Sequence, residues 1–261
     1  MLDSLLRIAR EAGEISLRYF GNLKQDQISC KSEEADMLTV ADKEVEDYLR
    51  QELNSHFPNV AFIGEESFTG KEEECSESFI VDPIDGTTNF IHNLPAYAVS
   101  IAFQSAGQTE IGVVYCPFLN NMYYAERGKG AYKDDARIQV SATDSLINAL
   151  ASSGFACVRE RKKPDNMEIF RKTVYQLRGI RISGSAAYDC CTVAEGMTDI
   201  YWEYNLKTWD IAAGALIVEE AGGKVTDLSG NENYDPAKSF VATNSTLHQA
   251  FLSAAGCNTT V

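Results

Sequence analysis

Histidine is scarce in this sequence, and the residue spacings typical of zinc sites are absent. Three histidines (His56, His92 and His248) occur among 261 residues, and there is no H-E-x-x-H or C-x-x-C motif. Zinc and other ions that prefer nitrogen or sulfur ligands therefore lack their usual partners. Asp and Glu total 38, and such oxygen ligands favour Mg²⁺, with Mn²⁺ as a substitute.

Basic residues are also in deficit. Lys and Arg total 23 against 38 Asp and Glu, and the resulting net charge of −15 opposes direct binding of nucleic acid or of an acidic membrane. The sequence has no secretory signal and no apolar run of about 18 residues. We therefore expect a cytoplasmic protein that is neither exported nor inserted in a membrane.

The seven cysteines are odd in number and irregularly spaced. This pattern argues against a disulfide framework and favours buried free thiols in a reducing cytosol.

A G-x-x-x-x-G-K-[ST] phosphate loop is absent too, so Gly128-Lys129-Gly130 is interpreted as a hairpin turn. The basic segment 159–163 predicts an exposed loop, and the alternative places it near the mouth of a site.

The most informative segment present is 82–90, which reads D-P-I-D-G-T-T-N-F. It follows a short apolar run that predicts a buried strand, so Asp82 and Asp85 leave the end of that strand together. The proline and glycine predict a tight turn, and residues 87–89 are suited to capping a following helix. Such a strand end can hold hard cations and a phosphate side by side. The alternative is an Asx-type turn whose aspartates only organise the loop.

Two further segments carry carboxylates. Gly64-Glu65-Glu66-Ser67 follows a short predicted strand, and Asp210 opens a helix that stays small and apolar through Val218. A helix of that composition is buried, so Asp210 starts it inside the protein; the alternative is a first-turn carboxylate that stabilises the helix dipole. A metal-dependent phosphatase is the leading hypothesis, because bound cations would let an acidic protein accept a phosphorylated substrate.

Hydrophobic periodicity and turn residues predict alternating helices and strands. Helices are expected at 2–20, 39–53, 164–177, 185–195, 208–221 and 245–255. Strands are expected at 60–63, 79–81, 97–104, 110–116, 122–126, 130–133, 149–155, 180–182, 199–204, 224–227 and 239–243. Polar loops are expected at 31–36 and 72–74. The early strands predict an antiparallel sheet covered by the first two helices, in an N-terminal α+β half (1–140) followed by a C-terminal α/β half (141–261).

Together the three carboxylate motifs resemble those of the inositol monophosphatase family of magnesium-dependent, lithium-sensitive phosphatases. G-E-E-S, D-P-I-D-G-T-T-N-F and W-D-I-A-A-G occur in order, at family-like separations, between Lys31 and Gly223. The resemblance implies a layered αβαβα sandwich, which the α+β / α/β pattern permits. It also implies two or three Mg²⁺ ions, inhibition by Li⁺ and a homodimer.

The resemblance implies a set of metal ligands. Glu65, Asp82 and the backbone carbonyl of Ile84 would hold the first Mg²⁺. Asp82, Asp85 and Asp210 would hold the second, and a third, weaker ion would lie near Glu65. Packed carboxylates repel one another, and cations neutralise them. Two cations about 4 Å apart would then stabilise the attacking and leaving oxygens while water attacks the phosphorus of the ester in line and displaces its alcohol.

The resemblance also implies a base for this reaction. The family uses a threonine–aspartate dyad together with a glutamate, and the matching residues here are Thr87, Asp42 and Glu65. Asp42 has a second interpretation, because Thr39-x-x-Asp42 fits a capping box at the start of a helix. Both interpretations can hold at once.

Substrate contacts follow from the same resemblance. The residues assigned to the substrate are Asp85, Gly86, Thr87, Gly184, Ser185, Ala186 and Glu203. Backbone N–H groups of Gly86 and Thr87 would meet phosphate oxygens. Glu203 matches a glutamate that accepts hydrogen bonds from substrate hydroxyls, and the alternative is an ordinary polar strand residue. Lys207 adds a cation that the animal enzymes lack.

The expected reaction is hydrolysis of inositol monophosphate, a small phosphorylated polyol. Relatives with the same metal core cleave fructose 1,6-bisphosphate, 3′-phosphoadenosine 5′-phosphate or histidinol phosphate. A bisphosphate needs an extra cationic contact, which Lys207 or segment 159–163 can supply. A hypothesis from another class is a regulatory role in which the protein binds transcription or ribosome-assembly proteins, as some bacterial relatives do.

Overall fold

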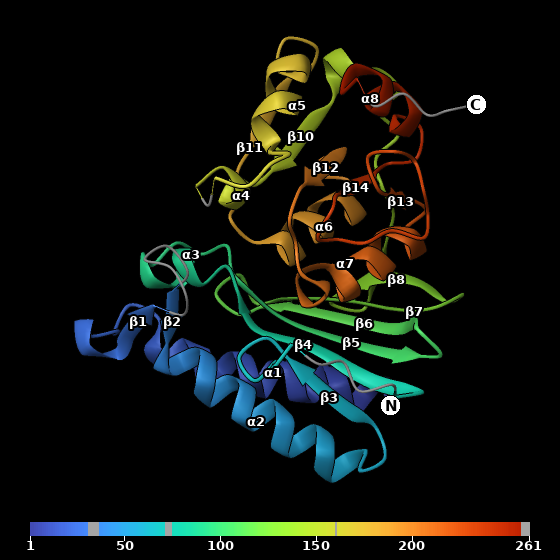
Figure 1. Ribbon diagram of the computed structural model, residues 1–261. Coiled ribbons are helices and arrows are strands. Elements are labelled where there is room, and N and C mark those ends of the chain that lie inside the picture. Colours follow the sequence, from blue (N-terminus) through green and yellow to red (C-terminus); the bar gives the residue numbers. More distant parts are fainter. Residues whose placement is uncertain (31–36, 71–74, 160, 257–261) are drawn as a thin grey trace.

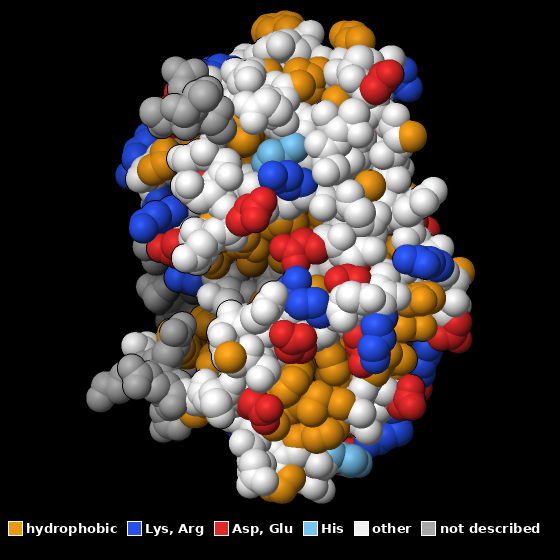
Figure 2. Space-filling view, turned by 90° about the vertical axis from the view of Figure 1, so that its right-hand side faces the viewer, with side chains coloured by type: hydrophobic (Ala, Val, Ile, Leu, Met, Phe, Trp, Pro, Cys, Tyr) orange, Lys and Arg blue, Asp and Glu red, His pale blue; other side chains and the backbone are white. Residues whose placement is uncertain are grey.

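The computed structural model describes residues 1–30, 37–70, 75–159 and 161–256. The loops expected at 31–36 and 72–74 therefore lie outside the described residues. Within the described ranges, no helix is both long and apolar enough to cross a membrane. On the face shown in Figure 2, basic and acidic side chains are interspersed, and apolar side chains gather in its lower part.

The first sheet contains seven strands in the order β3-β4-β5-β6-β7-β8-β9. Neighbouring strands are antiparallel except β3 and β4, which are parallel. Two amphipathic helices, α1 (Leu2–Tyr19) and α2 (Val40–His56), cover one face of this sheet (Figure 1). The strands are β3 (Ala61–Gly64), β4 (Glu77–Asp85), β5 (Ala98–Ser105), β6 (Gln108–Cys116), β7 (Asn121–Glu126), β8 (Gly130–Lys133) and β9 (Ala136–Ile138).

The second sheet contains five strands in the order β11-β10-β12-β14-β13. These strands are β10 (Leu150–Ser153), β11 (Gly179–Arg181), β12 (Ile200–Glu203), β13 (Lys224–Thr226) and β14 (Phe240–Thr243). Two helices, α6 (Ala186–Ala194) and α7 (Thr208–Glu220), lie between the sheets, and α5 (Asn166–Thr173) and α8 (His248–Ala254) cover the outer face (Figure 1). The layers run helix, sheet, helix, sheet, helix, which confirms the αβαβα sandwich.

Several short elements complete the fold. β1 (Ile28–Cys30) and β2 (Met37–Thr39) form a separate antiparallel pair. The remaining short elements are the helices α3 (Thr87–Ile91) and α4 (Ala156–Arg159) and the 3₁₀ turns η1 (Gln25–Gln27) and η2 (Leu146–Asn148). A helix was expected after residues 87–89, without stated bounds; the other short elements were not predicted, because three or four residues are too few to show a hydrophobic period.

Helix α7 is apolar around its circumference because it is buried on both sides. Eight of its thirteen residues are buried. A Cβ at Gly112 of β6 would lie 2.6 Å from the Ala213 carbonyl oxygen, and a Cβ at Gly214 would lie 2.6 Å from Cys190 Cβ. Glycine at these positions therefore lets α7 approach β6 on one side and α6 on the other. The first turn of α7, with Asp210, is thereby fixed between the layers.

The helices and strands predicted from periodicity are present, with ends that differ by a few residues. The hairpin turn at Gly128 and Gly130 is confirmed, because both have positive φ and the segment joins β7 to β8. The boundary at residue 140 stays a prediction. Helix α7, from the second half of the chain, packs against the first sheet, so the two halves share one layer.

Of the five cysteines whose side chains the structure describes, four follow the expectation. Cys116, Cys157, Cys190 and Cys191 are buried free thiols, whereas Cys75 is exposed. Burial raises the pKa of the Cys190 and Cys191 thiols well above the ordinary value, so these groups stay protonated and inert near neutral pH.

The segment 82–90 differs from its prediction in local structure. Strand β4 continues to Asp85, and its pairing with β5 shifts register between Asp82 and Asp85. The expected tight turn is therefore a bulge within the strand, a place where proline is tolerated. Gly86, with φ of +93°, is the N-cap of α3, so residues 87–89 lie inside this helix instead of capping it.

Candidate active site

A cavity of about 420 Å³ lies where the end of β4 and the starts of α6 and α7 come together. The assigned residues that line it are Glu65, Asp82, Ile84, Asp85, Gly86, Thr87, Gly184, Ser185, Ala186, Glu203 and Asp210. Asp42 is not among the lining residues and lies behind Thr87, to which it is hydrogen-bonded. The fold thus gathers residues that are more than 140 positions apart in sequence.

Four carboxylates reach the cavity from three places. Glu65 follows β3, where its N–H donates to the Val81 carbonyl (3.1 Å). Asp82 and Asp85 lie on β4, and Asp210 lies in the first turn of α7. Burial raises the pKa of Asp82 well above its ordinary value, and the charges of the other three carboxylates raise it further. Burial and neighbouring carboxylates also raise the pKa of Asp210. The four groups therefore lie within electrostatic reach of one another.

The chemistry of this donor set fits hard cations. Carboxylate oxygens are the ligands that Mg²⁺ prefers, and a cation among them relieves the repulsion that raises their pKa values. In the part of the chain that the structure describes, no three His, Cys, Asp or Glu side chains already have the spacing of a coordination shell.

Asp85 joins the first sheet to helix α6. Its carboxylate accepts hydrogen bonds from Ser185 Oγ (2.5 Å), Ala187 N (2.7 Å) and Ala186 N (3.3 Å). Burial raises the pKa of Asp85 to about 6, although these hydrogen bonds act in the opposite direction. Asp85, which is assigned as a metal ligand, is therefore in direct contact with Ser185, which is assigned to the substrate.

Two glycines let the start of α3 touch the loop before α6. Gly86 and Gly184 both have positive φ, and a Cβ at Gly86 would lie 3.0 Å from the Gly184 carbonyl oxygen. The amide of Asn89 fastens this contact by donating to the Ala96 and Ser183 carbonyls, at 2.6 Å each. Asn89 was predicted to cap a helix, and these two contacts were not predicted, because both acceptors are backbone groups.

The contacts of Asp42 are consistent with both of its interpretations, the capping box and the dyad with Thr87. Its Oδ2 accepts hydrogen bonds from Thr39 N (2.7 Å) and Thr39 Oγ1 (2.6 Å), which completes a capping box at the start of α2. The Thr87 hydroxyl lies 3.2 Å from Asp42 Oδ1 and 3.2 Å from the Ile84 carbonyl. Cap and dyad use different carboxylate oxygens, so neither excludes the other. The catalytic role of the dyad stays a prediction.

Asp210 likewise has a structural contact beside its place in the cavity. Its Oδ2 accepts a hydrogen bond from Lys207 N (2.7 Å) at the start of α7. Lys207 itself is exposed and does not line the cavity. The first-turn interpretation of Asp210 therefore holds, and it leaves the metal-ligand interpretation open.

Glu203, the last residue of β12, lines the cavity from the second sheet. It is buried, and its Oε2 accepts a hydrogen bond from Tyr201 OH (2.8 Å). A Cβ at Gly154 would lie 2.2 Å from Glu203 Oε1, so only glycine fits there. Gly154 also lines the cavity. It was missed because nothing near it in the sequence points to Glu203.

Asp189 is a second residue that the sequence did not single out. It lines the cavity from α6, is buried, and accepts a hydrogen bond from Ser183 Oγ (2.6 Å). Burial raises its pKa to about 7. The available signal was one acidic residue inside an otherwise apolar helix, since buried acids need a specific partner.

The basic segment 159–163 divides between two cavities. Arg159, exposed at the end of α4, lines the cavity that holds the carboxylates. Lys162 and Lys163 line a separate cavity of about 640 Å³, and Glu160 lies outside the described residues. Among the described lining residues of the first cavity, Arg159 is the single cation beside six acidic side chains.

The whole chain matches a known family. The model of the inositol monophosphatase family covers residues 1–260. The chain belongs to this family. It is 36% identical to an inositol-1-monophosphatase of Mesorhizobium japonicum over 254 residues, which cover 97% of this chain and 95% of that relative. The family is one of phosphatases, and the match confirms the resemblance seen in the three motifs.

Other members of the inositol monophosphatase family carry different names. A Nus factor SuhB of Pseudomonas aeruginosa is 39% identical over 259 residues (97% and 94% of the two chains). A fructose-1,6-bisphosphatase/inositol-1-monophosphatase of Thermotoga maritima is 36% identical over 247 residues (95% and 92%). The crystal structure of the extragenic suppressor protein suhB from Bartonella henselae superposes with a TM-score of 0.90 at 36% identity, covering 97% of each chain.

Proposed function

We propose that this protein is a Mg²⁺-dependent phosphomonoesterase that hydrolyses an inositol monophosphate to inositol and phosphate. One observation carries the proposal: four carboxylates from three separate segments line the same cavity as Glu203 and the start of α6. An acidic cluster that can take up cations next to a polar wall suits a phosphorylated polyol. The relative named inositol-1-monophosphatase supports this choice of substrate.

In this proposal the carboxylates hold the cations. Glu65, Asp82 and the Ile84 carbonyl would bind the first Mg²⁺, while Asp82, Asp85 and Asp210 would bind the second. When bound, the ions supply positive charge for the ester phosphate and make water more acidic. A third, weaker ion near Glu65, replacement by Mn²⁺ and inhibition by Li⁺ complete the proposed metal chemistry.

The remaining residues handle the proton and the substrate. The Thr87 hydroxyl lies 3.2 Å from Asp42 Oδ1, a distance over which it can pass a proton. Glu65 would act as base together with this dyad. Backbone N–H groups of Gly86 and Thr87 would bind phosphate oxygens, and Glu203 would accept hydrogen bonds from ring hydroxyls.

Phosphate release from inositol 1-phosphate tests the proposal. We expect turnover with Mg²⁺, none with a chelator, and less when Li⁺ is added. The Asp85→Asn variant should lose about 100-fold or more in kcat/KM, because it loses a charge at the centre of the site. The exposed Asp26 provides the matched control, Asp26→Asn, which should keep full activity.

Asp85 also accepts hydrogen bonds from α6, so the folded state of Asp85→Asn is verified by thermal unfolding. Activity near the wild-type level in this variant would remove Asp85 from the site. If Mg²⁺ supported no phosphate release from any phosphomonoester, the proposed function would be wrong.

A bisphosphate is the second candidate substrate, and Arg159 favours it. This is the one cation among the described residues of the cavity lining, so it can meet a phosphate that lies away from the carboxylates. The Thermotoga maritima relative, whose name includes fructose-1,6-bisphosphatase, supports this candidate. Fructose 1,6-bisphosphate, 3′-phosphoadenosine 5′-phosphate and histidinol phosphate therefore belong in the same assay.

A protein-binding role would be separate from catalysis. The Pseudomonas aeruginosa relative is named a Nus factor, which supports binding to transcription or ribosome-assembly proteins. The Asp85→Asn variant is a suitable bait, because a surface apart from the cavity should keep its partners after turnover is lost. We also infer a homodimer and a cytoplasmic location, and light scattering of the purified chain tests the first.

A further inference from the structure

Glu46 is a buried carboxylate on α2 that has no part in the ligand and substrate sets above. Its side chain is 3% exposed and pairs with Arg50 Nη2 through Oε1 at 2.6 Å. Its other oxygen, Oε2, accepts a hydrogen bond from the backbone N–H of Glu66 at 2.7 Å. Glu46 therefore connects α2 to the segment that follows β3.

The surroundings leave this carboxylate little freedom. A Cβ at Gly64 would lie 2.5 Å from Glu46 Oε2, so glycine is needed for the close approach. The guanidinium of Arg50 lies over the Phe62 ring, 4.9 Å from its centre. A buried carboxylate is stable only when paired and hydrogen-bonded, and here the charge partner and the backbone donor are both fixed.

The segment held in this way contains Glu65. Gly64 packs on Glu46, the Glu65 N–H donates to Val81 on β4, and the Glu66 N–H donates to Glu46. We propose that Glu46 is a positioning residue, which holds Glu65 where it can share a cation with the carboxylates of β4. This inference rests on the proposed function, because Glu65 is there a Mg²⁺ ligand. Groups that orient metal ligands typically change metal affinity 10- to 100-fold when removed.

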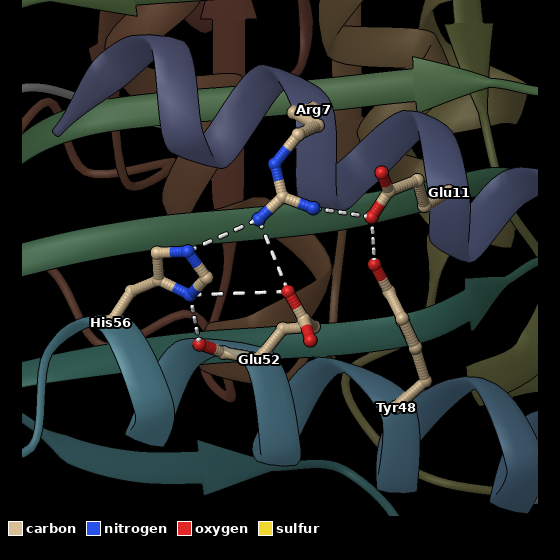
Figure 3. Close-up of polar contacts among 5 residues, drawn as sticks. All are labelled: Arg7, Glu11, Tyr48, Glu52 and His56. Carbon is tan, nitrogen blue, oxygen red and sulfur yellow. Dashed lines mark hydrogen bonds and ion pairs between the residues drawn. The ribbon is translucent and has the colours of Figure 1, made fainter.

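The same helix offers a matched control. Glu52 also lies on α2 and pairs with an arginine, Arg7 of α1, at 3.1 Å. Figure 3 shows this network, in which Arg7 also meets Glu11 and His56. These side chains join α1 to α2, and none of them lines the cavity. Loss of Glu52 should therefore weaken helix packing without moving Glu65.

Direct Mg²⁺ binding, measured by calorimetry on the full chain, tests the inference without using activity. Glu46→Ala should weaken the tightest Mg²⁺ site about 10- to 100-fold. Glu46→Gln, which keeps an acceptor for Glu66 N–H, should weaken it less. Glu52→Gln should lower the melting temperature and leave Mg²⁺ affinity within twofold of the wild type.

Equal Mg²⁺ affinity in Glu46→Ala and the wild type would overturn the inference. An equal loss in Glu46→Ala and Glu52→Gln would overturn it as well, because general loosening of α2 would then explain the effect. If Glu46→Ala does not fold, Glu46→Gln decides: it keeps the size of the side chain but removes the charge that pairs with Arg50, and the inference requires reduced Mg²⁺ affinity in this variant. A wild type that binds Mg²⁺ but hydrolyses no phosphomonoester rejects the proposed function alone, whereas a wild type that binds no Mg²⁺ rejects both.

Discussion

Three of the aspartates assigned to the site also accept hydrogen bonds from the backbone at the start of a helix. Asp42 accepts one from Thr39 N before α2, Asp85 accepts two at the start of α6, and Asp210 accepts one from Lys207 N before α7. The helix starts thus orient these carboxylates. Capping therefore does not exclude the proposed roles, which are base for Asp42 and metal ligand for Asp85 and Asp210, and we expect a substitution to change stability together with activity.

Arg159 provides a prediction at the residue scale. Arg159→Gln should lower kcat/KM for fructose 1,6-bisphosphate about tenfold, and should change kcat/KM for inositol 1-phosphate less than about twofold. A charge-assisted hydrogen bond contributes about 1.5–3 kcal/mol, and exposure to solvent reduces the gain for an exposed side chain. Steady-state kinetics at two salt concentrations measure both the loss and its screening.

Lys207→Gln is the matched control, because it removes one exposed cation that does not line the cavity. Arg159→Lys should keep part of the preference, since the charge remains. An equal loss for both substrates in Arg159→Gln would show that Arg159 does not recognise a second phosphate.

Residues were predictable from the sequence where they belong to contiguous motifs. The carboxylates of G-E-E-S and D-P-I-D-G-T-T-N-F are adjacent to apolar runs, so their place at strand ends was readable. Glu46, Gly154 and Asp189 were not. Their importance depends on contacts between segments distant in the chain, such as the 2.7 Å hydrogen bond from Glu66 N to Glu46, and a single sequence does not show such contacts.

At the scale of elements, helix α8 is attached to the second sheet by a buried histidine. His248, the first residue of α8, shares hydrogen bonds with Thr226 Oγ1 of β13 (2.9 Å) and Thr243 Oγ1 of β14 (3.0 Å). Burial, together with the nearby charge of Lys224, lowers the pKa of His248 to about 4. His248 is therefore neutral in the folded protein at any pH above that value.

This lowered pKa predicts how stability changes with pH. Because the unfolded histidine titrates near pH 6.5 and the folded one near 4, its contribution is fully present above pH 6.5 and is lost as the pH falls to 4. The loss is about 3 kcal/mol by pH 4. Urea unfolding measured from pH 7.5 to 4 should show that the free energy of unfolding falls less for His248→Gln than for the wild type.

His56→Gln is the control for this experiment, because His56 on α2 is 41% exposed (Figure 3). The free energy of unfolding of His56→Gln should change with pH in parallel with that of the wild type. If His248→Gln and the wild type lost stability in parallel, protonation of His248 would not be the cause.

Elements were predictable where a period could be counted. The apolar positions of α1 recur every three or four residues, and α7 is a continuous run of small apolar residues. The end of β4 was not predictable, because proline and glycine normally indicate a turn, whereas β4 accommodates Asp82 and Asp85 by a shift of register against β5. Tertiary pairing overrode the local turn signal.

At the scale of the whole molecule, the site lies between the two sheets and gathers like charges there. The chain carries a net charge of −15, and the described cavity lining includes six acidic residues against one basic residue. Such a cluster opposes the folded state unless cations or protons neutralise it. The proposed activity and the stability of the chain without metal therefore make opposite demands on the same residues.

Asp82→Asn makes this conflict measurable. The pKa of Asp82 is raised in the folded state by burial and by its carboxylate neighbours, so its contribution to stability is present at acidic pH and is lost as the pH rises. With a chelator at pH 8, Asp82→Asn should therefore melt at a higher temperature than the wild type, and the difference should disappear toward pH 4. Adding Mg²⁺ should raise the melting temperature of the wild type and not that of the variant, because ligand binding to the folded state stabilises it.

Asp26→Asn, at an exposed position, should match the wild type in every buffer. A lower melting temperature for Asp82→Asn at pH 8 without metal would mean that hydrogen bonds to this carboxylate, such as the one from Ile84 N at 3.0 Å, outweigh the repulsion.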